Sequence, residues 1–209
     1  MTVSTPSADP AASESDDRPA VRVGTASAIW ILIAGALGLT AAITLTVEKI
    51  ELLIDPSYVP SCSINPVLSC GSVMATPQAS EFGFPNSLLG IVAFSVVVVT
   101  GVLAVAKVAL PRRYWAGLAA GTLLGVVFIH WLIVQSLYQI GALCPYCMVV
   151  WTVTIPLLVV VASIALAPLA GNKVAHVIYQ WRWSLVTLWF VALILMILVR
   201  FWNYWSTLI

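Results

Sequence analysis

Two of the four cysteines form the motif Cys144-Pro145-Tyr146-Cys147, which is the clearest candidate for chemistry in this sequence. The spacing of three places both sulfur atoms on one face of a helix, where they can form a disulfide. The partial positive charge at a helix N-terminus lowers the pKa of a thiol, so Cys144 is the better attacking or leaving thiolate. The motif favours thiol–disulfide chemistry; an inert structural pair or half of a zinc site is the alternative. No histidine follows Cys147, so covalent haem attachment is not expected.

The other two cysteines, Cys62 and Cys70, lie in the segment PSCSINPVLSCGS. A disulfide that braces a loop would explain this pair by itself. Next to the first motif, however, the pair could exchange its disulfide with Cys144 and Cys147, which would make a two-step relay. A zinc site made of all four cysteines is a further alternative, although two C-x-x-C pairs are commoner in zinc sites.

Long apolar segments must position these cysteines, and they indicate a membrane protein. Of the 209 residues, 61% are hydrophobic and only 8% are charged, which leaves too few polar side chains to cover a soluble globule. The net charge of +1 excludes a basic face that binds nucleic acid. We therefore expect an all-α integral membrane protein in a lipid bilayer. The predicted transmembrane helices are 26–47, 85–106, 115–137, 143–167 and 184–203.

The segments outside these helices predict the orientation. Residues 1–25 are rich in Ser, Ala, Pro and Asp and are predicted to form a disordered tail, followed by a membrane domain over 26–209. Seven Lys and Arg residues lie on one side of the membrane and two on the other, which predicts a cytoplasmic N-terminus. The long loop 48–84 and all four cysteines then face the extracytoplasmic side of the inner (cytoplasmic) membrane.

Two further residues are candidates for binding. A dithiol relay beside hydrocarbon needs a lipid-soluble electron acceptor, and a quinone is the natural candidate because side chains cannot carry the electrons away. Asn86, at the start of the second predicted helix, could donate a hydrogen bond to a quinone carbonyl or cap its helix. His130 lies within a predicted span, where a hydrogen bond between helices is favoured over a functional role.

The order of these motifs resembles the vitamin K epoxide reductase family. The resemblance covers the first four predicted helices and implies a four-helix transmembrane bundle around a quinone, with the fifth helix in addition. In the functionally analogous DsbB family, the C-x-x-C comes in the first outer loop, so the order here is the reverse. The matching residues are Cys62-x7-Cys70, Thr76, Asn86-Ser87-Leu88-Leu89-Gly90 and Cys144-x-x-Cys147.

The resemblance implies a role for each cysteine. Cys144 and Cys147 would be the active-site disulfide, with Cys147 nearest the quinone ring. Cys62 and Cys70 would be the shuttle pair: a partner thiolate attacks at Cys62, and Cys70 then attacks Cys144. All four cysteines are therefore expected to be catalytic.

The resemblance also implies three residues near the quinone. Asn86 matches the quinone-oxygen donor of the family, and Thr76 matches its Ser or Thr on a short loop helix. Trp151 stands where the vertebrate enzymes place a Tyr that holds the vitamin K oxygen, so epoxide chemistry is not implied.

These expectations together predict a disulfide-forming thiol:quinone oxidoreductase with menaquinone or ubiquinone as acceptor and no metal. Since no thioredoxin-like domain follows the fifth helix, the thiol partner would be a secreted DsbA-like thioredoxin-fold protein acting in trans. The alternative is a membrane transporter or assembly protein with structural disulfides or a four-cysteine zinc site.

Overall fold

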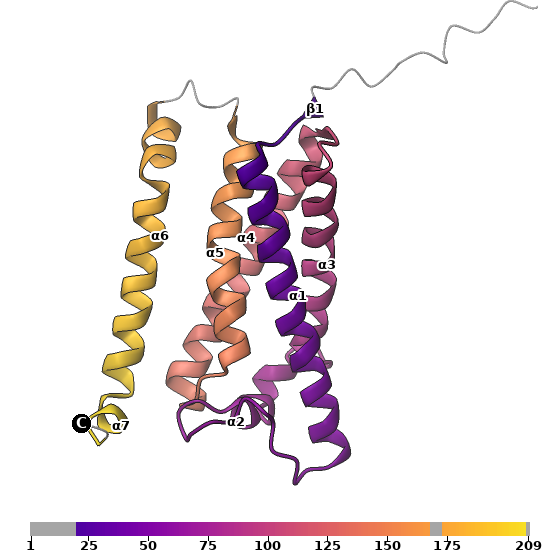
Figure 1. Ribbon diagram of the computed structural model, residues 1–209. Helices are drawn as coiled ribbons and strands as arrows, with labels where there is room; N and C mark the ends of the chain where they lie inside the picture. Colours follow the sequence, from indigo (N-terminus) through magenta and orange to yellow (C-terminus); the bar gives the residue numbers. More distant parts are fainter. Residues whose placement is uncertain (1–19, 168–172, 208–209) are drawn as a thin grey trace, which may run out of the picture.

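The computed structural model describes residues 20–167 and 173–207, in which long helices run side by side (Figure 1). Five helical segments of these described residues are long and apolar enough to cross a membrane. This confirms the predicted all-α membrane fold. The long helices are α1 (Thr25–Ile54), α3 (Asn86–Val105), α4 (Arg112–Val134), α5 (Pro145–Ala165) and α6 (Lys173–Arg200).

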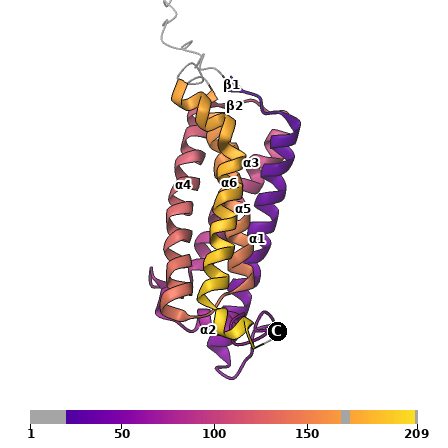
Figure 2. The same cartoon turned by 90° about the vertical axis from the view of Figure 1, so that its left-hand side faces the viewer.

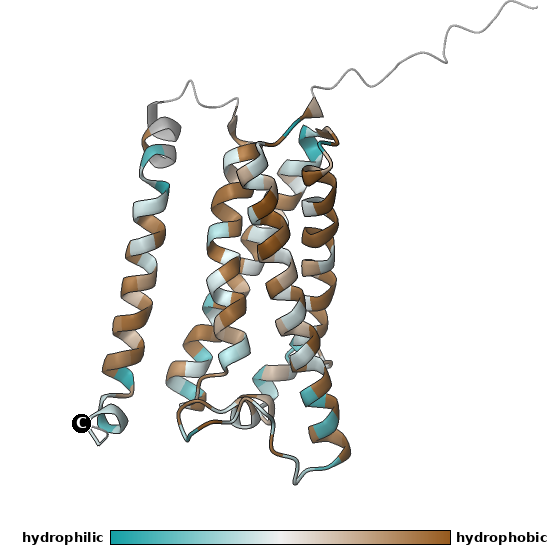
Figure 3. Ribbon diagram, in the orientation of Figure 1, coloured by the Kyte–Doolittle hydropathy of each residue, from teal (hydrophilic) through white to brown (hydrophobic). Residues whose placement is uncertain are grey.

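Prolines mark the starts of three of these helices. Pro85 and Pro111 immediately precede α3 and α4, and Pro145 is the first residue of α5. A proline suits these places because its φ angle fits the first turn, where its missing N–H has no partner to lose. Figure 3 shows apolar residues along the long helices and more hydrophilic residues gathered near their ends, as a bilayer requires.

Helices α1, α3, α4 and α5 form the bundle that surrounds the centre of the molecule. Helix α1 packs along α3 and α5, and α4 packs along α5. The contact between α1 and α3 is close at Gly101, where a Cβ atom would lie 2.6 Å from the Cα of Leu32. Small residues of this kind let two membrane helices approach backbone to backbone.

Helix α6 lies beside this bundle, next to α4 and α5 in the view of Figure 2. The indole Nε1 of Trp189 donates to Nε2 of His130 (2.8 Å), and Nδ1 of His130 lies 2.7 Å from the carbonyl oxygen of Val126. Near its end, Nε of Arg200 donates to the carbonyl oxygen of Leu137 (2.8 Å). His130 is thus hydrogen-bonded between helices, the interpretation that the sequence favoured.

The two ends of the bundle differ in their connections. At one end, strand β1 (Ala20–Val21) pairs antiparallel with β2 (Leu110–Pro111). Of the predicted disordered tail 1–25, residues 1–19 lie outside the described residues, and Ala20 and Val21 form β1. The opposite end holds the remaining short elements of the described chain. These are α2 (Cys70–Met74), η2 (Pro77–Ser80), the π-helical η3 (Gln135–Ile140) and α7 (Trp202–Trp205).

Candidate active site

The C-x-x-C motif lies directly after a chain reversal between α4 and α5. Helix α4 continues into the π-helical η3, and Gly141 ends it in the left-handed conformation (φ 70°). Glycine adopts this conformation at no steric cost, which is why it commonly ends helices. The N–H of Gly141 donates to the carbonyl oxygen of Ser136 (3.0 Å). Three residues later, Cys144 is the N-cap of α5, the position that the motif predicted.

A short parallel backbone pairing joins the long loop to this reversal. The N–H of Leu143 donates to the carbonyl oxygen of Val67 (2.7 Å), and the N–H of Ser69 donates to the carbonyl oxygen of Leu143 (2.9 Å). The side chain of Asn65 supports the loop by accepting from the N–H groups of Val67 (3.0 Å) and Leu68 (2.7 Å). The residues that follow the two paired segments, Cys70 and Cys144, therefore lie next to each other.

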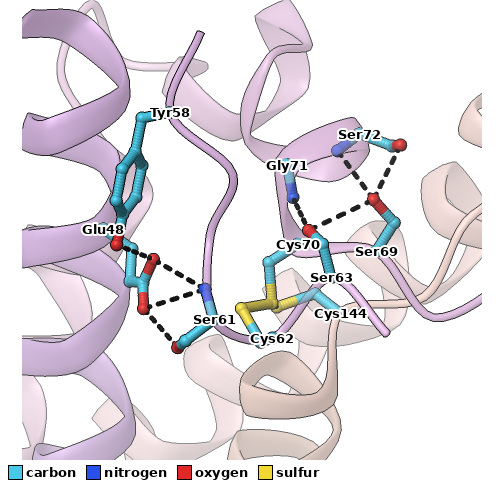
Figure 4. The surroundings of a disulfide bond; sticks show 10 residues. All are labelled: Glu48, Tyr58, Ser61, Cys62, Ser63, Ser69, Cys70, Gly71, Ser72 and Cys144. Atoms are coloured by element: carbon cyan, nitrogen blue, oxygen red, sulfur yellow. Dashed lines mark hydrogen bonds between the residues drawn. A yellow bond between two sulfur atoms is a disulfide. The ribbon is translucent and has the colours of Figure 1, made fainter. Parts of the chain in front are cut away.

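Three sulfur atoms are in contact at this point (Figure 4). Cys62 and Cys70 form a disulfide, and the sulfur of Cys70 lies 3.1 Å from the sulfur of Cys144. Cys144 and Cys147 are free thiols. Cys62, Cys70 and Cys144 are all buried. The arrangement lets Cys144 and Cys62 compete for a bond to Cys70, which is the geometry that thiol–disulfide exchange requires.

The surroundings of Cys144 favour its thiolate. A hydrogen bond from the Cys147 thiol lowers the pKa of Cys144, and the backbone N–H groups of Cys147 and Tyr146 act in the same direction. Burial of the sulfur and the negative charge of Glu48 oppose this effect, and the net shift of the pKa is downward. The lowered pKa favours the thiolate of Cys144, which is the direction expected for a thiol at a helix start.

Cys147 lies on the other side of the motif, where it lines a partly open cavity of about 210 Å³ between α1, α3, α4 and α5. The lining is almost entirely apolar. A concave, mostly apolar lining with a few polar groups is typical of sites that bind small organic ligands. Asn86 and Trp151 also line it, whereas Cys144 does not. The C-x-x-C motif therefore connects the loop disulfide on one side with an apolar cavity on the other.

Asn86 does not cap its own helix. It is the first residue of α3, and its Nδ2 donates to the carbonyl oxygen of Gln78 (2.7 Å) while its Oδ1 accepts from the N–H of Glu81 (3.3 Å). The side chain thus fastens the end of the long loop to the cavity wall. An amide nitrogen carries two N–H groups, so one of them remains for a bound ligand.

Few other polar groups of the cavity can donate to a ligand. The hydroxyls of Thr122 and Thr154 donate to carbonyl oxygens one turn back, at 2.7 and 2.6 Å. Trp151 is buried in the cavity wall. Thr76 is absent from the cavity lining, and its hydroxyl donates to the carbonyl oxygen of Val73 (2.7 Å). Thr76 therefore belongs to the loop and not to the cavity wall.

Sequence reasoning did not single out Glu48, which lies near the cysteines on α1. Glu48 is 6% exposed, and its carboxylate accepts hydrogen bonds from the loop that carries Cys62. The available signal was a single acid at the end of a long uncharged run, because ionisable residues beside membrane helices tend to have a function. Among the described residues, no three His, Cys, Asp or Glu side chains gather as a metal site.

Comparison with known protein families identifies a match. A sequence model described as "Vitamin K epoxide reductase family" matches residues 29–162, which is more than half of the chain. The match runs from the first turns of α1 into the last turn of α5 and includes all four cysteines and Asn86. No curated protein matches the chain.

Proposed function

The chain belongs to the vitamin K epoxide reductase family and is a membrane oxidoreductase, and on this premise we propose that it transfers electrons from a protein dithiol to a membrane quinone. The single observation that carries the proposal is the 3.1 Å contact between Cys70 and Cys144, with Cys147 facing the apolar cavity. This places one end of the motif against a disulfide and the other end against a site for an apolar molecule.

The first half of the proposed relay regenerates a dithiol in the loop. A thiolate of the partner attacks Cys62, which forms a mixed disulfide and releases Cys70 as a thiolate. The second partner thiol then attacks the mixed disulfide, so the partner leaves oxidised and Cys62 and Cys70 remain as a dithiol. Two electrons have passed from the partner to the loop.

The second half passes these electrons to the motif. The Cys70 thiolate attacks Cys144 of the Cys144–Cys147 disulfide and releases Cys147; Cys62 then attacks Cys70 and releases Cys144. The lowered pKa of Cys144 makes it the better leaving group in this last step. The described structure, with a closed loop disulfide and two free thiols in the motif, has the connectivity expected at this stage.

A quinone fits the cavity on chemical grounds. When bound, it accepts two electrons and two protons from the Cys144–Cys147 dithiol and leaves as a quinol. The apolar walls suit a ring with a prenyl tail, and the remaining N–H of Asn86 suits a carbonyl oxygen. Trp151 lines the same wall. We propose that the acceptor is menaquinone or ubiquinone. Thr76 would support the loop through its hydrogen bond to Val73.

We propose that the partner is a DsbA-like thioredoxin-fold protein acting in trans on the extracytoplasmic side of the inner membrane. The Lys and Arg distribution supports a cytoplasmic N-terminus, and the long loop with Cys62 then faces the exported proteins. In this assignment, residues 26–209 are the membrane domain. The net reaction converts a partner dithiol and a quinone into a partner disulfide and a quinol.

Quinone absorbance, followed in detergent with a reduced thioredoxin-fold protein as donor, tests this proposal. Wild-type protein should turn over, and the Cys147→Ala variant should not, even with dithiothreitol as donor. Cys62→Ala should fail with the protein donor and retain turnover with dithiothreitol, because a small dithiol can reach Cys144 directly. Dithiothreitol-driven turnover by Cys147→Ala would contradict the relay, and so would a wild-type protein that reduces neither quinone.

A further inference from the structure

Glu48 holds the part of the loop that leads to Cys62. Its carboxylate accepts from the hydroxyl of Tyr58 (3.0 Å), the N–H of Ser61 (3.2 Å) and the hydroxyl of Ser61 (2.5 Å), as Figure 4 shows. A buried carboxylate is costly unless donors surround it, and here every one of these donors comes from the loop. Glu48 therefore binds the segment from Tyr58 to Ser61 to the end of α1.

The two cysteines of the loop disulfide are consequently held by different helices. Ser61 directly precedes Cys62, so the side chain of Glu48 fastens this arm to α1. The arm that carries Cys70 is fastened to the start of α5 by backbone pairing at Leu143. The Cys62–Cys70 bond connects these two attachments.

The two attachments differ in kind. Backbone pairing, which involves no sulfur atom, holds Cys70 beside Cys144, whereas the attachment of Cys62 depends on hydrogen bonds to one carboxylate. Cys62 is only 6% exposed, so a partner thiolate reaches its sulfur only when this arm moves outward. Movement of the arm requires that the bonds to Glu48 break.

We infer that Glu48 is a positioning residue for Cys62: its carboxylate holds Cys62 over Cys70 and releases it when the partner thiol attacks. This inference rests on the proposed relay and adds to it the residue that fixes the position of the loop segment ending in Cys62. Glu48 touches neither a sulfur atom nor the cavity wall through any described hydrogen bond, so it acts through Ser61 and Tyr58.

The loop pair can be tested alone in a Cys144→Ala, Cys147→Ala background, without quinone or partner. The reaction is protein dithiol plus oxidised glutathione to protein disulfide plus two reduced glutathione, followed by maleimide gel shift. Glu48→Gln keeps the size of the side chain but replaces one accepting oxygen with an NH₂ group. We expect the equilibrium constant to fall about tenfold, the effect of losing one hydrogen bond to a charged group.

The pair Cys70 and Cys144 distinguishes a specific effect on the loop from a general loosening of the fold, because a general loosening would affect both pairs. In a Cys62→Ala, Cys147→Ala background only Cys70 and Cys144 remain. Glu48 reaches this pair only through its charge, so Glu48→Gln should change their disulfide equilibrium with glutathione far less than it changes that of the loop pair. Glu51→Gln is the matched control, because Glu51 is exposed on the same helix and its side chain makes no described hydrogen bond.

Each result decides the inference. A tenfold effect confined to the loop pair supports it, and Ser61→Ala should then shift the same pair in the same direction. Equal effects on both pairs would show that Glu48 merely stabilises the fold, and no effect on either pair would refute a positioning role. Since neither assay contains a quinone, a failure here is separate from a failure of the proposed relay. If Glu48→Gln does not fold, Ser61→Ala and Tyr58→Phe apply the same test.

Discussion

A Cys62→Ala, Cys147→Ala variant should form a disulfide between Cys70 and Cys144 with little movement of the backbone. The two sulfur atoms are 3.1 Å apart, so they need to approach by only about 1 Å to reach bonding distance. The residues are 74 positions apart in the chain, whereas Cys62 and Cys70 are 8 apart. The new disulfide would therefore close a much longer loop than the native one.

The difference in loop length gives the expected magnitude. Chain entropy predicts a stabilisation of about 2.5 kcal/mol for the loop pair and about 4.5 kcal/mol for the Cys70–Cys144 pair. Oxidation of the double variant should thus raise its free energy of unfolding by about 2 kcal/mol more than oxidation raises that of a Cys144→Ala, Cys147→Ala variant.

Two measurements check this expectation. Peptide mass spectrometry without reductant should find the peptides of Cys70 and Cys144 joined, and unfolding in mixed detergent should give the two oxidised-minus-reduced differences. A Cys62→Ala, Cys144→Ala variant is the control, since the contact described for Cys70 is with Cys144. The reasoning is refuted if the peptides remain separate, or if both disulfides stabilise their variants equally.

Three further predictions concern single residues. Glu48→Gln should lower the pKa of Cys144, because the negative charge of Glu48 raises this pKa. The alkylation rate of reduced Cys144, measured against pH by mass spectrometry, should therefore rise at a lower pH in the variant. An unchanged pH profile would exclude this charge effect. Asn86→Ala should raise the KM for quinone about fivefold or more through the loss of one hydrogen bond, and an unchanged KM would limit Asn86 to its contacts with the loop. His130→Phe removes the acceptor of Trp189 and should cost about 1 kcal/mol of stability with kcat unchanged; loss of turnover in the folded variant would contradict the structural role.

The sequence predicted the helices well, because uncharged runs of this length have few alternatives to crossing a membrane. It was less informative about where they end. Helix α1 continues to Ile54, beyond the last residue of the uncharged run, Val47. Charges are compatible with a helix once it has left the hydrocarbon, and at this end Lys49 donates to the carbonyl oxygen of Met74 while Glu48 accepts from the loop. Hydropathy therefore indicates which part of a helix lies in the hydrocarbon and not the residue at which the helix ends.

The candidate site was predictable in its parts but not in its assembly. The spacing of Cys144 and Cys147 indicated a helix start, and the structure has Cys144 at the N-cap of α5. The contact of Cys70 with Cys144 depends on backbone pairing at Leu143, which has no side-chain pattern that a sequence could display. The contacts of Asn86 with the loop could not be predicted either, because an amide can bind a ligand or the backbone with the same atoms.

The short separation of Cys62 and Cys70 has a consequence for the order of events during synthesis. The next cysteine, Cys144, lies 74 residues after Cys70, so a ribosome that adds about 5 to 20 residues per second reaches it about 4 to 15 s later. Throughout that interval the nascent chain contains only two thiols. The loop disulfide is therefore the only intramolecular pairing open to the growing chain, and wrong pairings can arise only after the C-x-x-C motif has been made.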